Sequence, residues 1–266
     1  MLKNKKKKNY NIMNYWSYCK LPFRLKRLCC SKDIKKTNCN ESVSEDNPKS
    51  VLSWNIQSLF CFTTPLKVKN IIENLLIFNS DVICLQEVFE DSIKQQIIKE
   101  LIDVYPYYLM GNTNKKYILC EDSGLLILSK YNINFVKEEL INECVLPDKL
   151  CGKTIIYFSI GNINFSNTHL QAHNPNIAEK QIKEIVNLSP FDDFIITGDL
   201  NHENADEILN ITKNNVENTW ENVILDYIIP IQCKNIKLNV IVIKMDLRNV
   251  TDHLPICSDI KRIEKK

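Results

Sequence analysis

The stretch FIITGDLN, residues 194–201, decides how the fold of this chain is interpreted. Its apolar, β-branched beginning predicts a buried strand that ends at the carboxylate Asp199, followed two residues later by the carboxamide Asn201. Strand-like alternation turns these two side chains to the same side. Together they suit one phosphate group: Asp199 orients or polarises an attacking water, and the Asn201 amide donates to a non-bridging oxygen. The alternative is an Asx-type turn, for which Gly-Asp-Leu-Asn is favourable.

A second stretch, TDHLPI at residues 251–256, repeats this arrangement later in the chain. Its proline disfavours a helix at the preceding residue and predicts a loop that enters a strand. Asp252 and His253 stand in that loop, and a histidine of ordinary pKa can take a proton from water near neutral pH. Asp226 lies on an Ile-rich strand, where a carboxylate is too costly unless it is paired.

Three earlier strands end in the same way. A largely apolar strand leads to Asn55 in VLSWN (51–55) and to Glu87 in VICLQE (82–87), and a third strand leads to His169 in INFSNTH (163–169). A carboxylate such as Glu87 is either a salt-bridge partner or a metal ligand, and a lone histidine at a strand end is more often structural. Mg²⁺ needs only one or two carboxylates besides water and phosphate oxygens. Five polar strand ends in this order predict one shared site.

The five motifs together resemble the endonuclease/exonuclease/phosphatase superfamily, magnesium-dependent enzymes that cleave phosphoesters. The resemblance covers residues 50–260 and implies an α/β fold of two packed mixed β-sheets flanked by helices, a four-layer DNase I-like sandwich. It implies Mg²⁺ as the cofactor, with Mn²⁺ as the alternative. It assigns Glu87, Asn55 and Asp252 to the metal side of the site, and His253, Asp199, Asn201, His169 and Asp226 to catalysis. In this family pattern His253 is the general base, Asp226 fixes it, and His169 donates to the phosphoryl oxygen.

The periodicity of the rest of the chain agrees with many strands and few helices. Strands are predicted at 51–55, 82–86, 125–128, 154–160, 163–168, 194–197, 224–229, 238–243 and 256–260. Helices are predicted at 68–76, from a cap at Asp91 to about residue 102, and at 175–188. This composition fits two packed sheets with helices outside them.

The net charge of +2 conceals two segments of opposite sign. Residues 1–36 contain twelve Lys and Arg and one acid, a net charge of +11, whereas the remaining 22 basic and 31 acidic residues give −9. We expect residues 1–49 to be a basic, flexible extension and residues 50–262 to be the catalytic domain. The extension interleaves aromatic and basic residues before Cys29 and Cys30, which favours either a solvated tail or attachment to an anionic membrane surface with acylation of a cysteine. Nuclear targeting or nucleic-acid contact is a third interpretation.

The remaining composition narrows the class of protein. Eleven cysteines without CxxC spacing predict reduced thiols inside a cell and speak against a zinc site. The sequence has neither a dinucleotide-binding glycine motif nor a P-loop, no apolar run of the ~20 residues that a membrane span needs, and no signal-peptide apolar segment. We therefore expect an intracellular protein that is a monomer, with a basic extension that is either a solvated tail or a peripheral membrane attachment.

The segment Thr168-His169-Leu170-Gln171-Ala172 points to a substrate class. It resembles the corresponding segment of sphingomyelin phosphodiesterases, which is also followed by a helix with acidic and glutamine residues. The acidic domain is an indifferent partner for a polyanion, because nucleic acids are bound chiefly through their phosphates. We favour a sphingomyelinase-like lipid phosphodiesterase. The alternatives are a nuclease acting on DNA or RNA and a non-catalytic scaffold that retains the fold. His173 and His202 are given no catalytic role.

Overall fold

The computed structural model describes residues 47–58, 63–111, 122–141, 143–212 and 217–263. The expectations for residues 1–46, including acylation of Cys29 or Cys30, lie outside these described residues. No helix in the described part is long and apolar enough to cross a membrane.

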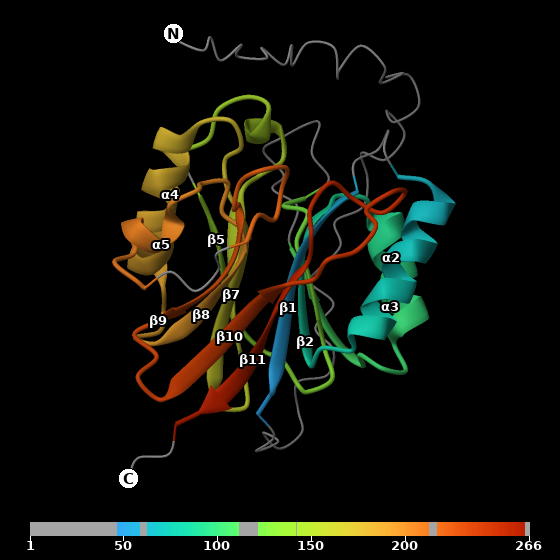
Figure 1. Cartoon of the computed structure of the whole chain (residues 1–266), viewed down its shortest axis with the longest axis horizontal. Helices are drawn as coiled ribbons and strands as arrows, with labels where there is room; N and C mark the ends of the chain where they lie inside the picture. Colours follow the sequence, from blue (N-terminus) through green and yellow to red (C-terminus); the bar gives the residue numbers. More distant parts are fainter. Residues whose placement is uncertain (1–46, 59–62, 112–121, 142, 213–216, 264–266) are drawn as a thin grey trace, which may run out of the picture. The chain divides into compact units, whose positions relative to one another are not determined.

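Two mixed β-sheets form the centre of the structure (Figure 1). The six-stranded sheet has the order β10 (Ile236–Val242), β11 (Ile256–Arg262), β1 (Ser50–Ser58), β2 (Val82–Val88), β4 (Leu126–Ser129) and β3 (Tyr107–Met110). The five-stranded sheet has the order β5 (Asn134–Leu140), β6 (Thr154–Ile160), β7 (Ile163–His169), β8 (Phe194–Asp199) and β9 (Asp226–Ile231). One neighbouring pair in each sheet is parallel, β1 with β2 and β7 with β8, and the other pairs are antiparallel.

Helices cover the outer faces of both sheets. Helices α2 (Pro65–Phe78) and α3 (Asp91–Leu101) pack on the six-stranded sheet, and α4 (Pro175–Leu188) packs on the five-stranded sheet next to the short α5 (Ala205–Ile208). Thr64 caps α2 and Asn174 caps α4, and both helices begin with a proline, which is compatible with the first turn because its missing N–H has no partner there.

Three apolar layers hold these parts together, because successive strand residues point to opposite faces of a sheet. On β1, Val51 packs between the two sheets, whereas Leu52 and Trp54 pack against α2 and α3. On β8, Ile195 belongs to the layer between the sheets and Ile196 to the layer beneath α4. The expected four-layer sandwich, with two mixed sheets inside and helices outside, is confirmed.

Some elements differ from the sequence-based expectation. The strands β3 and β5 were not predicted, and both are edge strands with a partner on one side only. β3 has only four residues, and β5 has the polar composition that an edge position tolerates. The short α5 was not predicted either. Helix α3 is preceded by Glu90 as its N-cap residue, so Asp91 is its first residue and not its cap. A carboxylate in that first turn is still favourable, because the N-terminal end of a helix carries positive partial charge.

The fold brings polar strand ends to one edge. The parallel pairs β1–β2 and β7–β8 end at this edge, β9 begins there, and the loop before β11 passes beside the end of β1. Here the layer between the sheets becomes polar: the Gln86 side chain donates to Asn167 Oδ1 (2.8 Å), and Asn167 donates to the Leu85 carbonyl (3.2 Å). These hydrogen bonds join the two sheets directly beneath the residues of the predicted site.

Candidate active site

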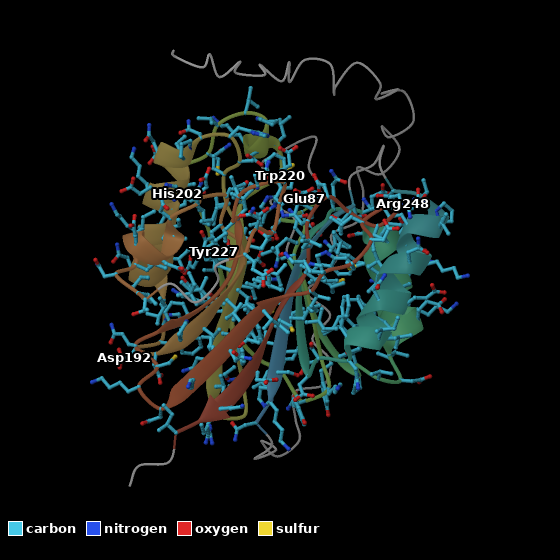
Figure 2. All side chains as sticks on the ribbon, viewed as in Figure 1. Glu87, Asp192, His202, Trp220, Tyr227 and Arg248 are labelled. Carbon is cyan, nitrogen blue, oxygen red and sulfur yellow. The ribbon has the colours of Figure 1, made fainter. Side chains whose placement is uncertain are left out.

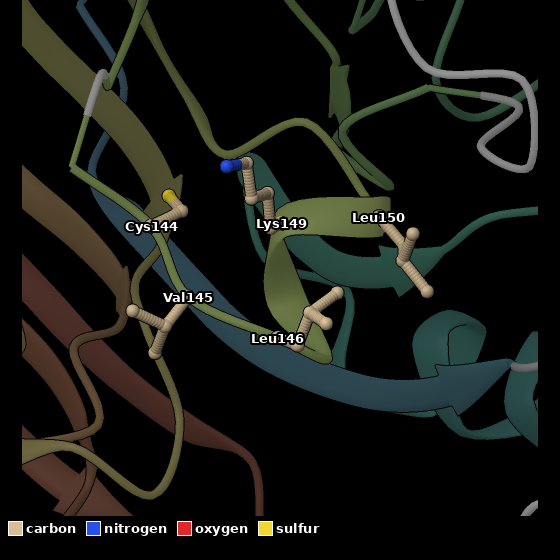
Figure 3. A pocket seen from close by; sticks show the side chains of 5 residues that line it. All are labelled: Cys144, Val145, Leu146, Lys149 and Leu150. Carbon is tan, nitrogen blue, oxygen red and sulfur yellow. The ribbon is translucent and has the colours of Figure 1, made fainter.

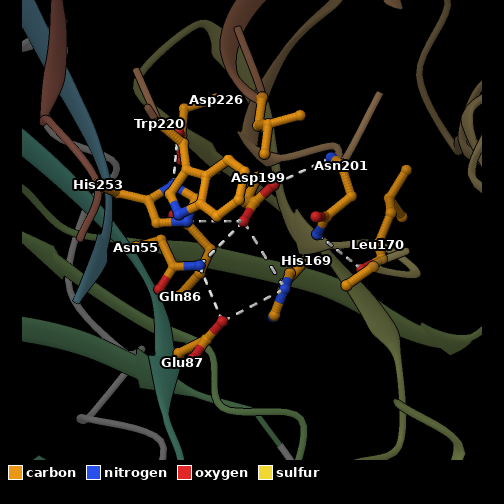
Figure 4. Close-up of polar contacts among 12 residues, drawn as sticks. Asn55, Gln86, Glu87, His169, Leu170, Asp199, Asn201, Trp220, Asp226 and His253 are labelled. Carbon is orange, nitrogen blue, oxygen red and sulfur yellow. Dashed lines mark hydrogen bonds and ion pairs between the residues drawn. The ribbon is translucent and has the colours of Figure 1, made fainter. Parts of the chain in front are cut away.

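Asn55 lies at the centre of the site, between two carboxylates (Figure 4). Its Nδ2 donates to Glu87 Oε1 (3.0 Å) from one sheet and to Asp199 Oδ2 (2.9 Å) from the other. Asn55 is fully buried on β1, and its side chain faces the space between the sheets because it follows the inward-facing Val51 by an even number of residues. One amide therefore links Glu87 of one sheet to Asp199 of the other, and Asp199 lies 144 positions after Asn55 in the sequence.

Glu87 stands near the end of β2 in a backbone conformation that aims its carboxylate into the site. Its φ is +57°, a left-handed value that non-glycine residues rarely adopt. The next residue is held by a hydrogen bond from Val88 N to the Gly124 carbonyl (2.8 Å). Gly124 has φ +71°, and a Cβ there would lie 2.7 Å from the Phe89 ring, so this support requires glycine. Burial raises the pKa of Glu87, and the hydrogen bond from Asn55 opposes that shift.

Asp199 and Asp226 face each other because β8 and β9 are paired in register at this position. Gly198 precedes Asp199, and its missing Cβ leaves space for the carbonyl of Thr168 on β7. Burial raises the pKa of Asp199 to about 7, and Asp226 adds to this shift, whereas His253 opposes it.

His253 and Asp226 form a buried pair. Nδ1 of His253 lies 2.8 Å from Asp226 Oδ2 in a hydrogen bond, and its Nε2 lies 3.8 Å from Asp199 Oδ2. The backbone is fixed as well, since Trp54 Nε1 donates to the His253 carbonyl (2.9 Å). Burial alone lowers the pKa of His253, but Asp226, Asp199 and Asp252 raise it to about 10. The expectation of an ordinary histidine pKa is therefore wrong for the protein without a bound cation, because three carboxylates surround this ring.

His169 is buried at the end of β7 beside both carboxylates. Its Nε2 lies 3.7 Å from Glu87 Oε1 and 3.8 Å from Asp199 Oδ2. Burial, with the charges of Lys153 and His253, lowers the pKa of His169 well below its ordinary value. A neutral imidazole with its proton on Nε2 fits this arrangement, since Nδ1 is buried without a hydrogen-bond partner. Such a ring can donate one hydrogen bond into the site.

Asn201 differs from the expected strand-like placement. The strand β8 ends at Asp199, and Asn201 has φ +50°, so the chain turns instead of alternating. Its backbone N–H donates to Asp199 Oδ1 (2.9 Å), and its side-chain amide donates to the Leu170 carbonyl (3.1 Å). The Asx-type turn is thus the observed local structure, and Asn201 holds Asp199 from the side opposite Asn55.

Asp252 lies at the rim, with 42% of its side chain exposed. Its Oδ1 is 4.0 Å from His253 Nε2, and its Oδ2 accepts a hydrogen bond from Trp220 Nε1 (3.2 Å). Trp220 also pairs with His253 through an isolated β-bridge, and the two ring centroids lie 6.3 Å apart. Figure 2 shows Trp220 and Glu87 at the same end of the two sheets.

Sequence reasoning missed two buried lysines beside the site. Lys153 forms an ion pair with Asp148 (2.9 Å) and is close enough to Glu87 to lower the pKa of that carboxyl. Lys67, in the first turn of α2, interacts electrostatically with Asp252 and Glu87. Neither lysine stands at the end of an apolar run, so the strand-end signal could not reveal them. Trp220 was missed as well, because a tryptophan in a loop carries no specific signal.

The oxygen ligands of the site fit a hard divalent cation. The partly exposed Glu87 and the buried Asp199 offer carboxylates around one amide nitrogen, and Mg²⁺ prefers such oxygen donors. A second set of atoms that lie close enough together to bind a metal comprises Asp199, Asp226 and His253. Within that set Nδ1 of His253 is already hydrogen-bonded to Asp226, which is the arrangement of a histidine held for proton transfer. The carboxylate oxygens on the Glu87 side are therefore the donors that His253 does not engage.

An open hollow of about 680 Å³ lies on the segment between β5 and β6 (Figure 3). Its wall consists of Cys144, Val145, Leu146, Lys149 and Leu150. This segment is tied to the chain that follows His169 at the end of β7, because Val145 N donates to Gln171 Oε1 (2.8 Å) and Gln171 Nε2 donates to Asp148 Oδ2 (2.7 Å).

The two other histidines lie apart from this constellation. His173 is exposed, and His202 accepts a hydrogen bond from Asn204 N (3.1 Å) at Nδ1.

Comparison with known proteins identifies the family. The model of the endonuclease/exonuclease/phosphatase family matches residues 52–230. No curated protein matches the chain. Among solved structures, the chain is similar to Sphingomyelinase C from Streptomyces griseocarneus, with a TM-score of 0.63, 16% identity, and coverage of 80% of this chain and 99% of that chain. It is also similar to a mutant beta toxin from Staphylococcus aureus with bound magnesium ions, with a TM-score of 0.64, 18% identity, and coverage of 80% of this chain and 99% of that chain. A third similar structure is humanized D. rerio TDP2, with a TM-score of 0.60, 17% identity, and coverage of 80% of this chain and 98% of that chain.

Proposed function

The chain belongs to the endonuclease/exonuclease/phosphatase family, and from this premise we propose that it is a metal-dependent phosphodiester hydrolase whose substrate is a sphingomyelin-like phospholipid. The observation that carries the proposal is the meeting of Glu87 and Asp199 at Asn55, beside the His253–Asp226 pair. This arrangement supplies oxygen ligands for a cation and a base for water within one buried site.

The proposed reaction is attack of water on the phosphorus atom. Glu87 would hold Mg²⁺, with Asn55 beside it and Asp252 at the rim. When bound, Mg²⁺ polarises the phosphate and offsets its negative charge. Asp199 orients the water, and His253 accepts its proton at Nε2 as the new P–O bond forms. The bond to the leaving oxygen breaks, and this oxygen takes up a proton from solvent water to leave as an alcohol. His169 donates from Nε2 to a non-bridging oxygen as charge builds up.

The charge of His253 links the base to the cation. With a pKa of about 10 the ring is protonated at neutral pH and cannot accept a proton. Its pKa is raised by carboxylates, so positive charge near Asp199 lowers it towards the range in which a base can work. A cation held by Glu87 would thus lower the pKa of His253 as well as offset the charge of the phosphate.

Several features support a lipid as the substrate. The Gln171 of the sphingomyelinase-like segment lies two residues after His169 and organises the neighbouring segment between β5 and β6. That segment exposes Val145 and Leu146, 40% and 68% exposed, next to the open hollow. Apolar side chains on a segment tied to a phosphoester site suit a substrate that has an acyl portion. Together with the net negative charge of residues 37–266, they favour a phospholipid over a nucleic acid.

A parallel hydrolysis assay tests the proposal. We expect release of the phosphorylated head group from sphingomyelin to depend on Mg²⁺ or Mn²⁺, to cease in EDTA, and to exceed cleavage of abasic DNA and of plain DNA. Glu87→Gln should weaken metal affinity without unfolding the protein. Faster cleavage of either DNA than of sphingomyelin would favour the alternative that the protein is a nuclease. Full turnover in EDTA after dialysis would refute the metal mechanism, and inactivity on all three substrates would favour the scaffold alternative.

A further inference from the structure

The first turn of α2 contains a lysine that points inward. Lys67 is only 5% exposed, although lysine is one of the residues least often buried. Its ammonium Nζ donates to the Gln57 carbonyl at 2.7 Å. Gln57 belongs to the end of β1, where the pairing with β2 shifts register between Asn55 and Ser58. The lysine therefore holds an irregular end of the strand that carries Asn55.

Gln57 has a backbone conformation that needs support. Its φ is +47°, a left-handed value that costs a residue with a side chain of order 1 kcal/mol or more. In this conformation its N–H donates to Asn55 Oδ1 at 3.0 Å. The hydrogen bond fixes the amide of Asn55 with its oxygen towards Gln57, so that Nδ2 faces Glu87 and Asp199.

We propose that Lys67 is a positioning residue that orients Asn55 through the backbone of Gln57. The chain of contacts runs from Lys67 Nζ to the Gln57 carbonyl, and from the Gln57 N–H to Asn55 Oδ1. At its end, Asn55 Nδ2 contacts the carboxylates that the proposed function assigns to metal and water. The inference rests on that proposed site. It adds a residue that lies outside the strand-end motifs in the sequence.

The two roles that Lys67 could play have opposite effects on the affinity of the site for a divalent cation. Lys67 is a cation that interacts with Glu87 and Asp252, so by charge alone its removal would strengthen the binding of a divalent cation. Loss of positioning would weaken that binding, because residues that orient metal ligands typically contribute about 10–100-fold to affinity. The direction of the change therefore separates the two roles.

The test measures Mn²⁺ binding by calorimetry on the full chain without substrate. Lys67→Met retains the apolar stem without the charge, and we expect it to weaken Mn²⁺ binding by about tenfold or more. The matched control is Lys69→Met on the same helix, because the Lys69 side chain is 69% exposed and forms its salt bridge with Glu73 at the surface. Its affinity should stay within about twofold of the parent, as expected for a screened surface charge.

Two substitutions at Gln57 examine the relay while Lys67 is present. Gln57→Val disfavours a positive φ and should weaken Mn²⁺ binding in the same direction as Lys67→Met. Gln57→Gly adopts a positive φ without strain and keeps both backbone groups, so it should bind Mn²⁺ like the parent. Combined with Lys67→Met, Gln57→Gly should restore most of the lost affinity. Circular dichroism of each variant separates these effects from unfolding, and the Gln57 pair decides the question if Lys67→Met does not fold.

Three outcomes would overturn the inference: unchanged or tighter Mn²⁺ binding by Lys67→Met, no rescue by Gln57→Gly, or equal affinity of the Val and Gly variants at position 57. These outcomes are distinct from failure of the proposed function. If the parent protein bound no Mn²⁺, or if Glu87→Gln bound it equally well, the metal site itself would be refuted.

Discussion

At the scale of single residues, the buried contact between Asp226 and His253 determines which nitrogen of the imidazole is available. Because Nδ1 is engaged at 2.8 Å, Nε2 is the atom that faces Asp199 and is left for a proton. We expect His253→Ala to lower kcat by about 10²–10⁴-fold, the usual contribution of a general base. His173→Ala, at an exposed position, should change kcat little. Steady-state kinetics on the best substrate compares them, and equal small effects would show that His253 is not the base.

The same pair predicts how stability depends on pH. The pKa of His253 is raised from 6.5 to about 10, so the pairing stabilises the folded state fully below pH 6.5 and is lost as pH rises towards about 10. Since a tenfold difference in proton affinity between the folded and unfolded states is worth ~1.4 kcal/mol, thermal unfolding in EDTA should occur at clearly lower temperature at the alkaline end of this range. Asp226→Asn removes the main source of the raised pKa and should flatten this dependence. A parallel pH dependence in both proteins would contradict the assignment of the raised pKa to Asp226.

At the scale of elements, helix α2 offers a direct test of the outer apolar layer. Leu75 is fully buried beneath the helix, whereas its neighbour Leu76 is 43% exposed. We expect Leu75→Ala to reduce the free energy of unfolding by about 2–5 kcal/mol because it leaves a cavity. Leu76→Ala should change it by no more than ~0.5 kcal/mol, as is usual for surface positions. Urea unfolding measures both, and similar losses at the two positions would show that α2 does not pack as described.

The elements also show what the sequence could reveal. The buried strands were predictable, since β2, β6 and β8 each contain an apolar run that ends at a turn signal or a polar residue, and β7 follows the Gly161-Asn162 hairpin signal after β6. The edge strand β5, with the sequence NFVKEEL, was not, because its residues are polar and its partner lies at one side only.

The site could be predicted as a set of residues but not as a set of contacts. Their positions at strand ends predicted that four residues share one site: Asn55, Glu87, His169 and Asp199. In the fold these residues lie within hydrogen-bond distance or near contact of one another. The turn at Asn201 could not be inferred, because Asx turns and extended strands are both open to the same four residues. Their catalytic roles remain predictions.

At the scale of the whole molecule, the basic extension provides a prediction about location. We propose that residues 1–46 direct the protein to anionic membranes, where each basic residue near the surface contributes roughly 1 kcal/mol. A truncated chain should begin at Asn47, since Asn47 Oδ1 accepts hydrogen bonds from Asn162 N (2.8 Å) and Arg262 Nη2 (3.0 Å). It should hydrolyse a small chromogenic phosphodiester normally and lose binding to anionic liposomes.

Salt provides the control for that experiment. Binding of the full chain to anionic liposomes should fall as the Debye length shrinks from ~10 to ~3 Å, and neutral liposomes should bind weakly throughout. Unchanged liposome binding by the truncated chain would assign the membrane contact to the folded domain. Salt-sensitive binding to DNA but not to liposomes would favour the nuclease alternative.

The pairing of β11 with β1 has a consequence for folding during synthesis. Trp54 and His253, which meet beside the site, are 199 residues apart in the sequence, and a ribosome delivers the first long before the second. A nascent chain can form β1 and β2 early, but β1 lacks one of its two neighbours until β11 emerges. His253, which the proposal makes the base, lies in the segment just before β11, whereas Glu87 and Asp199 belong to earlier strands. A chain that stops before Thr251 therefore carries both carboxylates but lacks the imidazole that the proposal assigns to the proton of water.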